Sequence, residues 1–82
     1  MSPEELLDIV QTATVGILGV PKDSVTLDAS FADDLDADSL ALVEIITEIE
    51  DALDIQVPTD DLKDVNTVGS AVDLLMAKLA AG

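Results

Sequence analysis

The sequence is 82 residues long and carries 18 acidic residues against three lysines and no arginine, which gives a formal net charge of −15 at pH 7. Cysteine and histidine are both absent, which excludes disulfides, structural zinc sites, thiol nucleophiles and serine–histidine–carboxylate triads. Hydrophobic residues nevertheless make up 49% of the chain. A disordered acidic tail is therefore excluded, and we expect a single small folded domain spanning residues 1–82.

The same composition restricts the partners and the location of the protein. Nucleic acids and anionic membranes attract lysine and arginine and repel an acidic surface, so basic proteins are the expected partners. The first residues lack the positive flank and apolar run of a signal peptide, and no apolar stretch approaches the ~18 residues of a membrane span. We expect a cytoplasmic protein without a membrane span, and we expect it to be a monomer.

The first predicted helix begins after Ser2. Ser2 as N-cap, Pro3 at the first helical position and Glu5 three residues after the cap form a capping-box pattern. Gly16 and Gly19 are expected to mark the end of the helix. Apolar residues recur at helical spacing on one face: Leu6, Ile9, Val10, Ala13 and Ile17.

Residues 20–36 are predicted to form a long loop. This segment shows no sustained periodicity and is rich in Pro, Ser, Thr and Asp, and loops of this length in small domains commonly serve function. The surrounding stretch 23–64 holds 14 of the 18 acids and only one lysine, so the charge is regional. Four apolar side chains are expected to pin the loop to the core: Val25, Leu27, Phe31 and Leu35.

The second predicted helix has Asp38 as its N-cap and extends to about Leu53. On a helical wheel its core face carries Leu42, Ile46, Ile49 and Leu53, with Ile45 at the margin. The opposite face, called the docking face below, carries Leu40, Val43, Glu44, Thr47, Glu48 and Asp51. Leu40 and Val43 are apolar yet point away from the core, which is unfavourable unless a partner covers them at times. We expect brief docking of basic protein surfaces here.

The remainder of the chain is predicted to be helical as well. Residues 59–64 form a short helical turn after Val57 and Pro58, and Thr67 caps a last helix that has Lys78 near its C-terminus. The buried stripe of this last helix is Val68, Ala71, Val72, Leu75 and Leu79. The predicted fold is therefore all-α, a small bundle of three longer helices and one short helix.

The acidic stretch before the second helix admits a metal-site interpretation and a purely structural one. Asp34, Asp36 and Asp38 occupy the first, third and fifth positions of an EF-hand-like loop. The sixth position is Ser39 rather than Gly and the twelfth is Ile45 rather than Glu, so we expect no dedicated metal site. In the structural interpretation, Asp38 merely caps the helix and Ser39 is an ordinary residue of its first turn.

A third interpretation rests on a spaced set of residues. Asp38-Ser39-Leu40 follows Phe31, Asp34 and Leu35 and precedes Val43-Glu44, Asp54-Ile55, Val57-Pro58 and Thr67-Val68-Gly69. The set resembles the acyl carrier proteins of the free-standing bacterial fatty-acid synthase type (type II) over about residues 4–79. The resemblance implies a carrier rather than an enzyme, with 4′-phosphopantetheine attached to Ser39 and acyl groups held on it as thioesters.

The resemblance also implies roles for neighbouring residues and for partners. Asp38 and Leu40 flank Ser39 and belong to the expected cofactor site. A phosphodiester on Ser39 would lie near unpaired backbone N–H groups and the positive end of the helix dipole. The implied partners are a phosphopantetheinyl transferase, acyltransferases, ketosynthases and reductases with basic docking surfaces. An internal acyl pocket is expected from Phe31, Ile45, Ile49, Leu62, Val65 and Ala71, although ordinary core packing explains the same residues.

Departures from the family pattern keep alternatives open. Asp36 stands where the family commonly has Gly, Ala41 where an acid is frequent, and Thr47 where an apolar contact residue is frequent. These departures leave open which pathway enzymes the chain prefers, and a carrier for polyketide synthesis remains the closest alternative. A peptidyl carrier fits less well, because an acidic sequence replaces the usual Gly-rich approach to the serine. A non-carrier acidic adaptor that binds basic proteins or mimics nucleic acid is the alternative from another class.

Overall fold

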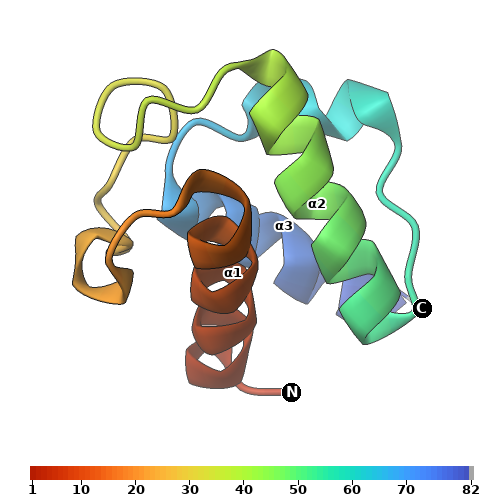
Figure 1. Cartoon of the computed structure of the whole chain (residues 1–82). Helices are drawn as coiled ribbons and strands as arrows, with labels where there is room; N and C mark the ends of the chain where they lie inside the picture. Colours follow the sequence, from red (N-terminus) through yellow and green to blue (C-terminus); the bar gives the residue numbers. More distant parts are fainter. Residues whose placement is uncertain (82) are drawn as a thin grey trace.

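A computed structural model describes residues 1–81 (Figure 1). The three longer helices are α1 (Pro3–Leu18), α2 (Ser39–Leu53) and α3 (Val68–Ala81), and two 3₁₀ turns, η1 (Lys22–Ser24) and η2 (Thr59–Asp64), lie between them. The predicted all-α bundle with three longer helices and a helical turn at residues 59–64 is confirmed, whereas η1 was not predicted. No helix within residues 1–81 is long and apolar enough to cross a membrane.

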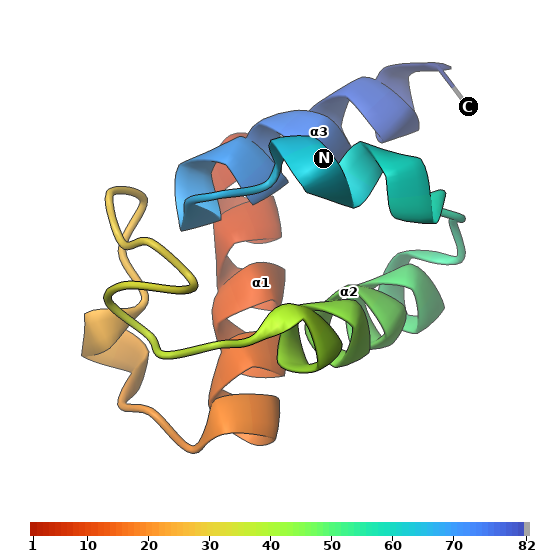
Figure 2. The same cartoon turned by 90° about the horizontal axis from the view of Figure 1, so that it is seen from above.

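Helix α1 is the central element of the bundle. It packs against both α2 and α3, and Figure 2 shows it extending from α3 on one side to α2 on the other. The capping box is confirmed, since Glu5 N–H donates to the Ser2 hydroxyl (3.2 Å) and Ser2 N–H donates to the Glu5 carboxylate (3.1 Å). The hydrogen bond from Ser2 N–H to the Glu5 carboxylate lowers the pKa of Glu5, and the hydrogen bond with the Ser2 hydroxyl lowers it further.

The core is aliphatic apart from Phe31 and is shared by all three longer helices and the long loop. Among the residues whose burial the structure describes, Thr14 is the one fully buried polar residue; the apolar pattern missed it, and its hydroxyl donates to the Val10 carbonyl (2.7 Å). That bond satisfies the hydroxyl within α1, so its burial leaves no polar group unpaired. The buried apolar residues include Leu6, Val10, Val25, Phe31, Leu35, Ile45, Ile46, Ile49, Val68, Ala71, Val72 and Leu75.

Two expectations about the core are wrong, and a helix boundary shifts. Leu27 is 50% exposed instead of pinning the loop, because the backbone makes that attachment: the Leu27 carbonyl accepts from Gly69 N–H (2.9 Å). A Cβ on Gly69 would lie 3.0 Å from that oxygen, so glycine permits the close approach. Ile45, expected at the margin of the core face, is fully buried, whereas Leu42 and Leu53, nearer the ends of α2, are half-buried. Helix α1 continues through Gly16 to Leu18 before Gly19 (φ 71°) ends it.

Backbone hydrogen bonds fix the loop that leads into α2. Phe31 N–H donates to the Asn66 carbonyl and Val68 N–H donates to the Ala29 carbonyl, both at 3.0 Å, which ties the loop to the start of α3. Ser30 N–H donates to the Asp34 carboxylate (2.7 Å) and closes the turn. The loop before α2 is therefore held by contacts between residues 35 and 39 positions apart in the chain.

Candidate functional site

The N-terminal end of α2 presents an exposed hydroxyl. Ser39 is the first residue of the helix and is exposed, and the Asp38 carboxylate accepts from Ala41 N–H (2.8 Å) as the predicted N-cap. The Asp38 carbonyl accepts from Leu42 N–H (3.0 Å). Within the described residues no group accepts from the N–H of Ser39 or Leu40, so these two donors and the positive end of the helix dipole lie beside the hydroxyl.

The docking face predicted from the helical wheel is exposed in all six of its residues. Leu40 is 68% exposed and Val43 is 42% exposed, both large fractions for apolar side chains. Thr47 satisfies its hydroxyl within the helix by donating to the Val43 carbonyl (2.8 Å). Two apolar side chains therefore lie on the surface within one turn of Ser39, and the remaining members of the face are the carboxylates of Glu44, Glu48 and Asp51.

The carboxylates of this face take part in no ion pair among the described residues. Helix α2 contains no lysine or arginine, and each of the three lysines of the chain pairs with an aspartate outside α2. The pairs are Lys22–Asp8 (2.6 Å), Lys63–Asp60 (3.7 Å) and Lys78–Asp61 (2.6 Å). The carboxylates of the docking face therefore present uncompensated negative charge to an approaching partner.

The acidic loop before α2 uses several of its carboxylates for local structure. Asp34 closes the turn at Ser30, Asp38 caps α2, and within residues 1–81 no group of three or more carboxylates is arranged to hold a metal ion. Asp36 adopts a left-handed conformation (φ 55°), which a side chain disfavours and glycine does not. This conformation is one that glycine adopts without strain.

A hollow of about 390 Å³ lies beside Ser39. Its lining includes Phe31 and Val65, two of the six residues expected to form an acyl pocket. Of the other four, Ile45, Ile49 and Ala71 are buried in the adjoining core and Leu62 is half-buried against it. The sequence did not indicate the other lining residues, because the hollow depends on the long-range contact between the loop and the start of α3. These residues are Ser30, Ala32, Asp33, Ala37, Leu42 and Asn66.

Fold and site together define a class of protein. An exposed serine begins a helix in a small acidic bundle, and no histidine or cysteine exists anywhere in the chain to activate its hydroxyl. Such a serine is suited to be modified by another enzyme, and the apolar and acidic surface beside it is suited to be bound by others. These features are those of a small carrier domain.

Comparison with known proteins defines the family. The chain matches the family described as a phosphopantetheine attachment site over residues 8–75. It is 43% identical over 81 residues to the acyl carrier protein of Guillardia theta, and this alignment covers 99% of this chain and 100% of the relative. It is 44% identical over 79 residues to the acyl carrier protein of Petrotoga mobilis, and this alignment covers 96% of this chain and 93% of the relative.

The solved structures agree with the sequence comparisons. The structure of acyl carrier protein from Enterococcus faecalis aligns with a TM-score of 0.75 and 32% identity, over 95% of this chain and 99% of that chain. The chain therefore belongs to the acyl carrier protein family, whose members are carriers rather than enzymes and hold a covalently attached 4′-phosphopantetheine. Membership implies interaction with a phosphopantetheinyl transferase and with enzymes that handle acyl groups.

Proposed function

We propose that Ser39 is the attachment point of the 4′-phosphopantetheine arm and that the chain delivers acyl groups, as thioesters, to enzymes of fatty acid biosynthesis. The observation that carries the proposal is the position of Ser39, exposed as the first residue of α2 beside the two unpaired N–H groups of Ser39 and Leu40. When bound, the arm supplies the terminal thiol that a cysteine-free chain lacks.

The residues at the start of α2 fit a phosphodiester. Its negative charge is favoured near the unpaired N–H groups and the positive end of the helix dipole. The Asp38 carboxylate is held by Ala41 N–H at 2.8 Å, which fixes it as a cap while leaving the Ser39 hydroxyl exposed. Leu40 offers an apolar contact directly beside the attachment point for the enzyme that transfers the arm.

The docking face is proposed to bind basic surfaces of partner enzymes. Charge complementarity raises the rate of encounter, and the small apolar contact at Leu40 and Val43 adds specificity without a large buried area. A contact of this kind suits a carrier that must leave one enzyme before it meets the next. The proposed partners are the transferase, acyltransferases, ketosynthases and reductases.

An acyl chain is proposed to enter the core from the side of Ser39. Support comes from the hollow beside Ser39, because its lining residues Phe31 and Val65 belong to the same buried cluster as Ile45 and Ile49. The test is the thermal midpoint of the protein carrying acyl groups of increasing length. Internal binding predicts a midpoint that rises with chain length until the pocket is full, because a group that binds only the folded state stabilises it. A midpoint independent of chain length would contradict this part of the proposal.

Reconstitution tests the pathway. The arm-bearing protein is loaded with acyl groups and incubated with a ketosynthase of the fatty-acid type or, in parallel, with one of the polyketide type. Faster elongation by the fatty-acid enzyme is expected, and a preference for the polyketide enzyme would replace the proposed pathway. The proposal further includes a single carrier domain spanning residues 1–82, a monomeric state and a cytoplasmic location, which follow from the composition and charge of the chain.

A further inference from the structure

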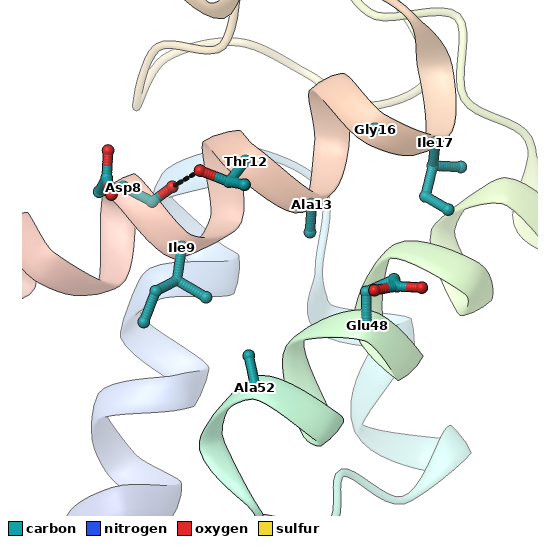
Figure 3. Close-up of a pocket in the computed structure, with 8 residues that line it drawn as sticks. All are labelled: Asp8, Ile9, Thr12, Ala13, Gly16, Ile17, Glu48 and Ala52. Atoms are coloured by element: carbon teal, nitrogen blue, oxygen red, sulfur yellow. Dashed lines mark hydrogen bonds between the residues drawn. The ribbon is translucent and has the colours of Figure 1, made fainter.

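A groove of about 370 Å³ runs between α1 and α2 and does not include Ser39 (Figure 3). Its α2 wall begins at Glu48, about 14 Å along the helix from Ser39 at the usual rise per residue. Glu48 also belongs to the docking face, so the groove adjoins that face on the side of α1. The lining residues are Asp8, Ile9, Thr12, Ala13, Gly16, Ile17, Glu48 and Ala52.

The floor of the groove is apolar and only partly covered. Figure 3 shows the side chains of Ile9 and Ala13 pointing from α1 toward Ala52 on α2. Ile9 and Ala13 are half-buried and Ala52 is exposed. The Thr12 hydroxyl donates to the Asp8 carbonyl (2.9 Å), so the part of Thr12 that stays free for contact is its methyl group. Small side chains on facing helices thus leave room for an apolar group from outside.

Gly16 has no structural reason to be glycine within this chain. It lies in the last turn of α1, where glycine is less favourable than alanine, and its φ is not in the left-handed region. A Cβ added there would meet no atom within 4 Å apart from the adjacent residues and the backbone of its own helix, so packing against the rest of the chain does not exclude a side chain either. The open space at Gly16 is therefore consistent with a partner that approaches the α1 backbone closely.

The charge at the groove selects a basic occupant. Its two carboxylates are on opposite walls, and Asp8 already pairs with Lys22 at 2.6 Å. Glu48 takes part in no ion pair among the described residues, and its helix carries no cation. A lysine or arginine that follows an apolar side chain into the groove would find its counter-charge at Glu48.

We propose that this groove receives a basic amphipathic helix of a partner protein, with an apolar side chain seated among Ile9, Ala13 and Ala52 and a basic side chain paired with Glu48. A volume of about 370 Å³ is at the small end of the range for ligand pockets, which suits side chains of a helix better than a whole cofactor. Contact at this groove extends docking from α2 onto α1 and does not require modification of Ser39.

The experiment is a titration of the isotopically labelled protein with a synthetic helical peptide that has leucines on one face and lysines on the other. A control peptide carries serine in place of leucine at equal charge. Saturable shifts of the amide signals of Ala13, Gly16 and Ala52 are expected with the leucine peptide and not with the control. Shifts confined to Leu40 and Val43, or equal binding of the two peptides, would overturn the proposal.

Substitutions within the groove sharpen the test. Gly16→Met fills the open space and is expected to weaken peptide binding about tenfold, which corresponds to about 1.4 kcal/mol. As a control, Ala77→Met at an exposed position of α3 is expected to leave the affinity unchanged. Gly16→Ala serves as a smaller change if the methionine variant has a lowered thermal midpoint, and it is expected to weaken binding less. Unchanged affinity in both Gly16 variants would refute a role for the groove.

Charge and modification are tested separately. Glu48→Gln is expected to weaken binding several-fold and to reduce its salt dependence, whereas the exposed Asp23→Asn has little effect. Equal effects of these two variants would show that only the net charge matters and would contradict the proposed pair. Ser39→Ala is expected to bind the peptide as the native chain does, so a failure of the proposed carrier function would leave this result intact.

Discussion

The C-terminal end of α2 carries several carboxylates, although negative charge is unfavourable at that end of a helix. Asp54 caps this helix in a left-handed conformation (φ 55°, ψ 48°), and its backbone N–H donates to the Glu50 carbonyl. Glu50 and Asp51 lie in the same last turn, and no basic residue is present there. Because the partial charge at this end of a helix is also negative, we predict that Asp54→Asn stabilises the protein.

The magnitude follows from two contributions. A carboxylate at the unfavourable helix end costs about 0.3–1 kcal/mol, and its repulsion from a like charge four residues earlier, Glu50, costs about 0.2–0.5 kcal/mol. Asparagine tolerates the left-handed conformation, so the backbone is not disturbed. The total gain is about 1 kcal/mol, or about 4–8 °C in the thermal midpoint of a domain of this size.

The assay is thermal unfolding at low and at high salt, with a matched variant at the opposite kind of helix end. Glu4→Gln removes the same charge from the first turn of α1, where a carboxylate is favourable, and is expected to lower the midpoint slightly. Salt is expected to shrink both effects. If the two variants raised the midpoint equally, general charge reduction would explain the gain and the reasoning from the helix end would be refuted.

Three further predictions concern docking, pH and a loop contact. Glu44→Lys reverses a charge on the docking face and is expected to slow acyl transfer from a partner enzyme by about tenfold at low salt with an unchanged thermal midpoint; unaltered transfer rates at low salt would count against the docking face. Glu5 has a folded-state pKa below its ordinary 4.5, so its stabilisation is complete above that pH and is lost as the pH falls through the folded-state pKa. The difference in unfolding free energy between the native chain and Glu5→Gln should therefore shrink below pH 4.5, and a constant difference would disprove the assignment. Glu50→Ala removes the acceptor of Val57 N–H (2.8 Å) and is expected to cost about 1–3 kcal/mol, whereas Glu50→Gln, which keeps an acceptor oxygen, should cost less than half as much in denaturant unfolding; equal losses in the two variants would contradict the role of this hydrogen bond.

Local signals in the sequence predicted the helices well. Ser2, Asp38 and Thr67 each precede a helix and accept from an N–H of its first turn, and these contacts depend only on residues up to three positions away. The placement of Ser39 at the start of α2, and the exposure of Leu40, follow from the same local information and from helical periodicity. Features of this kind are available to sequence reasoning without knowledge of the tertiary fold.

The errors concern long-range contacts. Leu27 is apolar, but the loop is attached at that point by a backbone bond to Gly69, which no pattern around Leu27 could indicate. Thr14 is buried by the packing of the other elements on α1, and its hydroxyl tolerates this because it is satisfied within the helix, so its residue type misleads a search for apolar stripes. The left-handed backbone of Asp36 favours glycine, so the structure does not explain why aspartate stands at this position.

The most direct test of the account is the intact mass of the protein after incubation with coenzyme A and a phosphopantetheinyl transferase. The native chain is expected to gain the mass of one phosphopantetheinyl group, and Ser39→Ala is expected to gain none while retaining a native helical spectrum. Ser30→Ala, in the loop that leads to α2, is a matched control that should be modified like the native chain. A gain in the Ser39→Ala variant, or no gain in the native chain, would contradict the assignment of Ser39 as the site of the arm.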